Sequence, residues 1–176
     1  KDALALVKTA QEYKSPLRII ETVVAINDKR KHAMADRVIS ACGGSVCDKT
    51  IAILGLTFKP NTDDMRDSPS LAILPALLEA GATVRAYDPE GMEEAMQIMP
   101  EITYCDDAYS AMEGADALVI VTEWNEFRSL DLDRVKSLLS KPIIVDLRNI
   151  YAPSDMAQAG FSYYCIGRAF GSQVVQ

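Results

Sequence analysis

The sequence predicts an α/β fold, a doubly wound and mostly parallel sheet of about six strands preceded by a long helical arm. Short apolar runs alternate with helix-like segments over most of the 176 residues, which is typical of strands joined by crossover helices. The clearest run, residues 51–54, is apolar at every position, as expected of a strand buried on both faces. We divide the chain into an arm, residues 1–41, and a sheet domain, residues 42–176.

Composition and charge restrict the partners of the protein. The net charge of -7 argues against nucleic acid, because phosphate binding needs a basic face. No apolar run is long enough for a membrane span and the chain opens on charged residues, so we expect no membrane partner and a cytoplasmic location. The 4 cysteines form no CxxC pair and only 1 histidine is present, so we expect reduced thiols and no metal site.

Helical periodicity predicts two helices in the arm. The first covers residues 2–13, with Asp2 as an N-cap or first-turn acid. The second covers residues 17–41, longer than an ordinary globular helix, and its apolar residues spread over more than one stripe. We therefore expect it to pack against a segment outside residues 1–176 or against a second subunit, and we favour a homodimer. The alternative is that it only covers one face of its own sheet. His32 on this helix is expected to be solvated.

In the sheet domain, strands and helices are predicted to alternate. The first strand is followed by a long polar loop and a helix over residues 71–80, with Ser68 as N-cap and Pro69 at the first helical position. Further strands are predicted over residues 83–87, 102–105, 117–121, 143–145 and 161–164. Further helices are predicted over residues 92–99, 107–113, 130–139 and 154–159.

The polar loop after the first strand is the strongest candidate binding site. In open parallel sheets, loops at the carboxyl ends of strands line the ligand crevice. This loop carries Lys59 and Arg66, with Phe58 beside the lysine, and Arg148 follows a later strand. These cations favour an anionic ligand. The alternatives are that Lys59 and Arg66 are solvated cations balancing nearby aspartates, and that Arg148 pairs with Asp146 or caps a helix.

A stretch of 14 residues in this loop, TFKPNTDDMRDSPS at residues 57–70, resembles the signature of the UDP-binding domain of the nucleotide-sugar 6-dehydrogenases. The resemblance implies a Rossmann-like domain that binds a UDP-sugar, NAD as cofactor, and a dimerisation role for the arm. The segment TEWNEFR at residues 122–128 favours the members that convert UDP-glucose to UDP-glucuronate. Members acting on GDP-mannose or UDP-N-acetylmannosamine share the FKP and RxSP elements and stay open as alternatives.

The same resemblance assigns roles to individual residues. The substrate-binding residues that it implies are Phe58, Lys59 and Arg148. Arg66 corresponds to an arginine that reaches towards NAD. Lys1 and Asp2 match the end of the family's catalytic Cys-Phe-Pro-Lys-Asp segment, which implies that Lys1 lies beside the cofactor, that Asp2 is a catalytic carboxylate, and that the nucleophilic cysteine lies just upstream.

Neither the catalytic cysteine nor the NAD-binding turn of such an enzyme is recognised within residues 1–176. Cys47 in GGSVCDK imitates the catalytic segment, but it is displaced and precedes the first strand at the amino end of the sheet, so we interpret it as structural. The first strand ends in Gly55 and Leu56 without a GxGxxG turn, so NAD is expected to bind mainly to another domain and this chain to be inert alone.

The remaining hypotheses are a non-catalytic nucleotide-binding module and a phospho-receiver-like domain. Gly55 and Leu56 disfavour the phospho-receiver-like domain, because an acidic pair is needed at their positions. Trp124 is expected to pack in the core.

Overall fold

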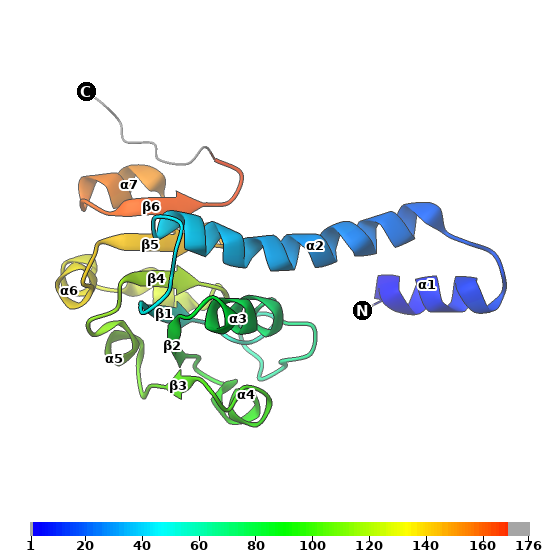
Figure 1. The fold of residues 1–176 in the computed structure, drawn as a ribbon, viewed down its shortest axis with the longest axis horizontal. Helices are drawn as coiled ribbons and strands as arrows, with labels where there is room; N and C mark the ends of the chain where they lie inside the picture. The colour runs from blue at the N-terminus through cyan, green and yellow to red at the C-terminus, as the bar shows by residue number, and fades with distance from the viewer. Residues whose placement is uncertain (1, 169–176) are drawn as a thin grey trace.

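A six-stranded, entirely parallel sheet forms the centre of the molecule (Figure 1). The computed structural model describes residues 2–168, so Lys1 lies outside the described residues. The strands are β1 (Thr50–Leu54), β2 (Thr83–Tyr87), β3 (Thr103–Tyr104), β4 (Ala117–Ile120), β5 (Ile143–Asp146) and β6 (Ser162–Cys165). Their order is β3-β2-β1-β4-β5-β6, so the winding reverses between β1 and β4, where such sheets bind ligands.

Helices cover both faces of the sheet. On one face, the apolar side chains of Ile51 and Ile53 pack under α2 (Arg18–Ala41), α3 (Ser70–Glu79) and α4 (Met92–Ile98). On the other face, Ala52 and Leu54 pack under α5 (Ala108–Met112), α6 (Leu132–Leu138), α7 (Pro153–Gln158) and the 3-10 helix η1 (Asn125–Ser129). Successive strand residues point to opposite faces, so a strand covered on both sides is apolar at every position. The predicted doubly wound fold is confirmed.

The predicted strands and helices of the sheet domain are present, with ends shifted by about one or two residues. The segment after β4 contains η1. One local prediction was wrong, because the N-cap position of α3 is Pro69 rather than Ser68. The hydroxyl of Ser68 instead donates to the carbonyl oxygen of Leu56 at 2.6 Å, although it also accepts the N–H of Ser70 at 3.3 Å.

The arm consists of α1 (Asp2–Glu12) and α2. In Figure 1, α1 runs back along α2, so its first residues point towards the sheet domain. The C-terminal part of α2 is buried against the domain through Ala35, Val38 and Ala41. Its outer part exposes apolar side chains, with Ile19 79% and Ile26 58% accessible. Covering its own sheet therefore accounts for only the C-terminal part of α2.

Candidate functional site

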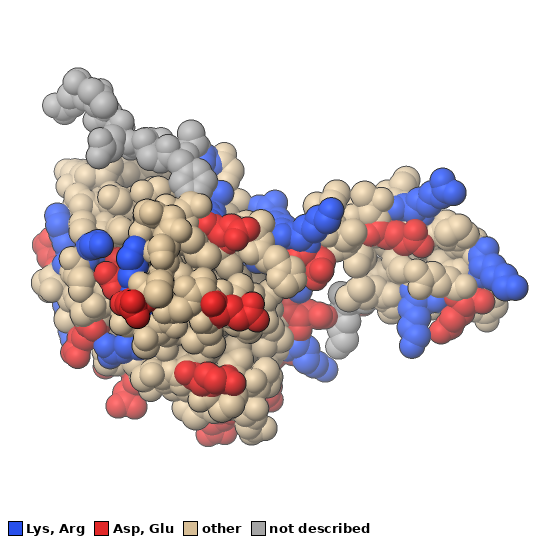
Figure 2. Space-filling model, viewed as in Figure 1, with Lys and Arg blue, Asp and Glu red and all other residues tan. Residues whose placement is uncertain are grey.

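A cavity of about 1000 Å³ lies between the arm and the carboxyl edge of the sheet. Its domain wall comes from segments that follow four strands, with the residues Phe58, Val121, Leu147, Arg148 and Ile166. The arm supplies the opposite wall through α1 and α2, including Ala3, Leu4, Val7, Val24 and Met34. Figure 2 shows the arm projecting from the sheet domain. The site is thus at the predicted edge of the sheet, and the arm completes it.

Charged groups line the cavity together with the apolar wall. The basic lining residues are Arg30, Lys31 and Arg148, and the acidic ones are Glu21, Asp28 and Asp67. The ammonium of Lys31 donates to the carbonyl oxygen of Asp67 at 3.0 Å, which ties α2 to the loop after β1. Cations from two separate elements therefore face one space, as binding of a multiply charged anion requires.

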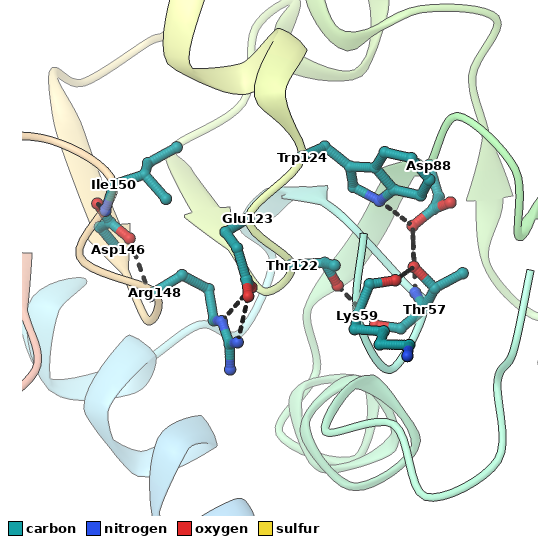
Figure 3. Close-up of polar contacts among 9 residues, drawn as sticks. All are labelled: Thr57, Lys59, Asp88, Thr122, Glu123, Trp124, Asp146, Arg148 and Ile150. Carbon is teal, nitrogen blue, oxygen red and sulfur yellow. Dashed lines mark hydrogen bonds and ion pairs between the residues drawn. The ribbon is translucent and has the colours of Figure 1, made fainter. Parts of the chain in front are cut away.

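The guanidinium of Arg148 is held by the carboxylate of Glu123. Arg148 Nε donates to Glu123 Oε2 at 2.5 Å and Nη2 donates to Oε1 at 2.7 Å (Figure 3). Burial of Glu123 acts to raise its pKa, but the hydrogen bonds and charge of Arg148 outweigh burial, and the net pKa is lowered. The pairing of Arg148 with Asp146 considered above is wrong for the side chain, because Asp146 receives only the backbone N–H of Arg148.

Asp146 fixes the backbone of the loop that carries Arg148. Its carboxylate is completely buried and accepts the N–H groups of Arg148, Ile150 and Tyr151 at 2.9, 2.7 and 3.2 Å. It also accepts the hydroxyl of Tyr163 at 2.6 Å. Burial, and then the hydrogen bond to Asp146, raise the pKa of Tyr163, so its hydroxyl remains a donor at neutral pH. The loop after β5 is therefore closely fixed at the edge of the cavity.

A second buried carboxylate, Asp88, closes the turn after β1. Its Oδ2 accepts the N–H group of Leu56 at 2.6 Å. It also accepts the N–H group of Thr57 and the indole N–H of Trp124, both at 3.1 Å (Figure 3). N–H groups at this turn hold the pyrophosphate in dinucleotide-binding folds. Here Asp88 already occupies them, so the turn does not fit NAD. Trp124 is buried, as predicted.

Gly55 allows the turn after β1 to lie directly against the segment after β4, so the cavity begins farther along both segments. It has a φ of +89°, and a Cβ at this position would lie 2.5 Å from the Cβ of Thr122. Thr122 in turn donates its hydroxyl to the carbonyl oxygen of Thr57 at 2.7 Å. The segments after β1 and β4 therefore touch directly where the winding reverses. The open space begins farther along them, at Phe58 and Val121.

The structure brings only some of the predicted site residues together. Phe58 and Arg148 both line the cavity. Lys59 follows Phe58 and is exposed, but it is not among the lining residues. Arg66 is also exposed and binds Asp64 through its Nε and Nη2 atoms, both at 2.8 Å. Arg66 is not among the residues that line the cavity.

Of the remaining sequence-based residues, Asp2 lies beside the cavity and Cys47 lies away from it. Asp2 is exposed at the start of α1, next to the lining residue Ala3. Cys47 is exposed and precedes β1, which places it at the amino edge of the sheet, away from the cavity. Among residues 2–168, no group of histidine, cysteine and acidic side chains is arranged to hold a metal ion. In the same range, no helix is long and apolar enough to span a bilayer.

Sequence reasoning assigned no role to several residues that shape the site. Glu123 lies within TEWNEFR, a motif from which no role for it follows, and Arg30 and Lys31 are two of several charged residues in the second predicted helix. The signal for Asp88 was its place directly after β2 and before a proline, since a carboxylate there is close to the neighbouring turns. No pattern in the sequence indicates which donors it accepts.

Comparison with known proteins identifies the family. Residues 52–153 match the model of the UDP-glucose/GDP-mannose dehydrogenase family, UDP binding domain. The chain belongs to this family. A UDP-glucose 6-dehydrogenase of Rhizobium meliloti (strain 1021) is 58% identical over 168 residues, which are 96% of this chain and 38% of that protein. UDP-glucose 6-dehydrogenase TuaD of Bacillus subtilis is 43% identical, over 96% of this chain and 36% of that protein.

Solved structures of dehydrogenases share the fold of this family member. A UDP-glucose dehydrogenase of Pyrobaculum islandicum has a TM-score of 0.74 and 26% identity, over 93% of this chain and 35% of that one. NDP-N-acetyl-D-galactosaminuronic acid dehydrogenase of Methanosarcina mazei has a TM-score of 0.76 and 28% identity, over 85% of this chain and 32% of that one. The family member described here thus spans less than two fifths of the length of its curated relatives, 38% and 36% for the two above.

Proposed function

We propose that the chain is part of an NAD-dependent UDP-glucose 6-dehydrogenase, which oxidises UDP-glucose to UDP-glucuronate, and that it supplies half of the substrate site. The observation that carries the proposal is the cavity at the carboxyl edge, which both Phe58 and Arg148 line in a domain of this family. The substrate is assigned from the names of the similar proteins, several of which are UDP-glucose 6-dehydrogenases.

In this proposal three residues bind the nucleotide sugar. The planar guanidinium of Arg148 matches pairs of phosphate oxygens, so it binds the diphosphate. Phe58 is 48% exposed despite its aromatic ring, which suits a surface that becomes covered by the ligand. Lys59 contacts hydroxyl or phosphate oxygens at the rim of the cavity. Its long and flexible side chain allows this from a position beside Phe58.

NAD is the proposed oxidant, and when bound it accepts hydride from the alcohol of the sugar. Because Asp88 occupies the turn after β1, we propose that NAD binds mainly to a part of the protein outside residues 1–176. Arg66 is proposed to contact it after release from Asp64, and Lys1 to lie beside it. Asp2 is proposed as a catalytic carboxylate, which the position of α1 on the cavity wall supports. The chain alone is then expected to be inert.

A homodimer in the cytoplasm completes the proposal. The exposed apolar side chains of Ile19, Val23 and Ile26 lie on the outer part of α2, where a second subunit would cover them. Substitution of Val23 and Ile26 by serine is expected to lower the mass of the full-length protein, measured by light scattering, to that of one subunit.

Two other functions are compatible with parts of these observations. A dehydrogenase of another nucleotide sugar is favoured by the likeness to a UDP-D-ManNAc dehydrogenase of Pyrococcus horikoshii, with a TM-score of 0.73 and 28% identity. GDP-mannose is the further alternative substrate. A non-catalytic nucleotide-binding module is favoured by the displaced Cys47 and the closed turn after β1.

The experiment is an assay of NAD reduction by the full-length protein with UDP-glucose, UDP-N-acetylmannosamine and GDP-mannose. UDP-glucose is expected to give the highest kcat/KM, and no reduction with any of the three would contradict the enzyme proposal. Lys59→Ala is expected to weaken UDP-glucose binding roughly tenfold, the effect of one charge-assisted contact. Lys141→Ala is the matched control, because Lys141 is exposed and precedes β5 at the opposite edge. Equal binding by both variants and the wild type would contradict the role of Lys59.

A further inference from the structure

The contact between Glu123 and Arg148 uses only one side of the guanidinium. Glu123 accepts from Nε and Nη2, which leaves both N–H groups of Nη1 and the second N–H of Nη2 without a contact to the carboxylate. Among these, one N–H of Nη1 and the second N–H of Nη2 are parallel and point away from the side chain. We call this pair the end-on fork, and it matches a pair of phosphate oxygens. Arg148 lines the cavity, whereas Glu123 is not among the lining residues.

Glu123 is itself held at a fixed position. Its two neighbours in the chain are buried, and each is bound to another segment. Thr122 donates to the carbonyl oxygen of Thr57, and Trp124 donates to the carboxylate of Asp88 (Figure 3). The carboxylate of Glu123 thus extends from a rigid part of the chain. Arg148 has a long side chain that would otherwise lose rotational freedom when a ligand binds.

We infer that Glu123 is a positioning residue of the UDP-sugar site: it fixes the guanidinium of Arg148 so that the end-on fork faces the diphosphate. This inference rests on the proposed function, since it needs a diphosphate in the cavity. It deepens that proposal by giving a role to an acidic residue that would repel the ligand if charge alone mattered. The benefit is preorganisation, because the arginine is already ordered before the ligand arrives.

The sign of one substitution separates positioning from charge. If Glu123 acted only through its negative charge, Glu123→Gln would make the site more positive and UDP would bind more tightly. If Glu123 positions Arg148, the variant loses one of the two contacts, because an amide nitrogen cannot accept from the guanidinium. UDP then binds about three- to tenfold more weakly, the range expected when one long side chain must be ordered on binding.

The experiment is calorimetric titration of UDP into the full-length protein and its variants. Glu90→Gln is the matched control, because Glu90 is an exposed carboxylate at the same sheet edge and is not a lining residue. Its UDP affinity is expected to stay at the wild-type value. Arg148→Lys is expected to weaken binding more than Glu123→Gln, and Glu123→Gln should add no further loss to Arg148→Lys. Glu123→Asp, which keeps the charge but shortens the reach, is expected to weaken binding as well.

Two further readouts exclude a merely structural effect. The KM for UDP-glucose should rise in Glu123→Gln while kcat stays unchanged. The difference in UDP affinity between wild type and Glu123→Gln should shrink as the pH falls towards the lowered pKa of Glu123, because a protonated carboxyl resembles the amide. Equal or tighter UDP binding by Glu123→Gln, with the wild type binding UDP, would overturn the inference alone. A wild type that does not bind UDP would overturn the proposed function and this inference with it.

Discussion

Asp88 and Asp146 are buried carboxylates at the carboxyl edge of the same sheet, yet they shape the site in opposite ways. Asp88 accepts 6 hydrogen bonds, which join the turns after β1 and β2 to Trp124 and close that part of the edge. Asp146 accepts 4, three of them from backbone N–H groups of the loop after β5, that of Arg148 included, and one from the hydroxyl of Tyr163. The side chain of Arg148 is left facing the cavity.

The comparison teaches that a carboxylate at a strand end has no single role. A carboxylate whose donors come from several neighbouring loops closes the space between them. A carboxylate whose donors come from its own loop and the next strand leaves that space open and fixes the residues beside it. The ligand site of this domain is therefore expected on the side of Asp146, and the side of Asp88 is expected to be structural.

The largest expected effect is on stability, at Asp88. Asp88→Ala leaves the N–H groups of Leu56 and Thr57 and the indole of Trp124 buried without an acceptor. The free energy of unfolding is expected to fall by about 3 kcal/mol or more. Chemical denaturation of the full-length protein measures this. Asp107→Ala is the control, because Asp107 is an exposed N-cap of α5 and should cost about 1 kcal/mol. Equal losses in the two variants would remove the distinction that we draw for Asp88.

A smaller effect is expected at Asp146, and it should reach the ligand. Asp146 accepts fewer hydrogen bonds than Asp88, and one of its donors, Tyr163, is only partly buried and can donate to water instead. The free energy of unfolding of Asp146→Ala is therefore expected to fall by about 2 kcal/mol. Because the loop that carries Arg148 is released, UDP affinity is expected to fall roughly tenfold as well. Titration of UDP under conditions where the variant remains folded tests this. Wild-type affinity would show that Asp146 supports the fold without shaping the site.

The smallest effect concerns the pH dependence of stability through Glu123. Its pKa is lowered in the folded protein, so the folded state favours the ionised form more than the unfolded state does. This contribution is present above the ordinary pKa of a glutamate and is lost as the pH falls through the lowered value. It is expected to be below about 1 kcal/mol, because both partners are partly exposed. The difference in stability between wild type and Glu123→Gln, measured by denaturation at pH 7 and pH 3, should shrink at the lower pH. A difference that grows instead would contradict the lowered pKa.

Much of the fold followed from the sequence because its signals are local. A run such as residues 51–54 is apolar at every position only when both faces of a strand are covered, and the alternation of such strands with helices predicted the doubly wound sheet. The approximate place of Phe58 and Arg148 was predictable for the same reason, since both follow strands and parallel strands end at one edge.

The paired contacts of the site were not predictable, because they depend on how distant loops meet. Glu123 and Arg148 are 25 positions apart in the sequence, and a different conformation of either loop would separate their side chains. Asp88 accepts from residues as distant as Leu56 and Trp124, which no spacing rule connects. The orientation of Lys59 is also set by the loop geometry and not by its position in the motif.

The most direct test of the central claim is a crystal structure of the full-length protein with UDP. The account predicts that the diphosphate lies in the cavity between the arm and the sheet, within hydrogen-bonding distance of the Nη atoms of Arg148, with Glu123 still bound to the other side of the guanidinium and Phe58 covered by the ligand. UDP bound at another place, with Phe58 and Arg148 free of contacts to it, would contradict the account.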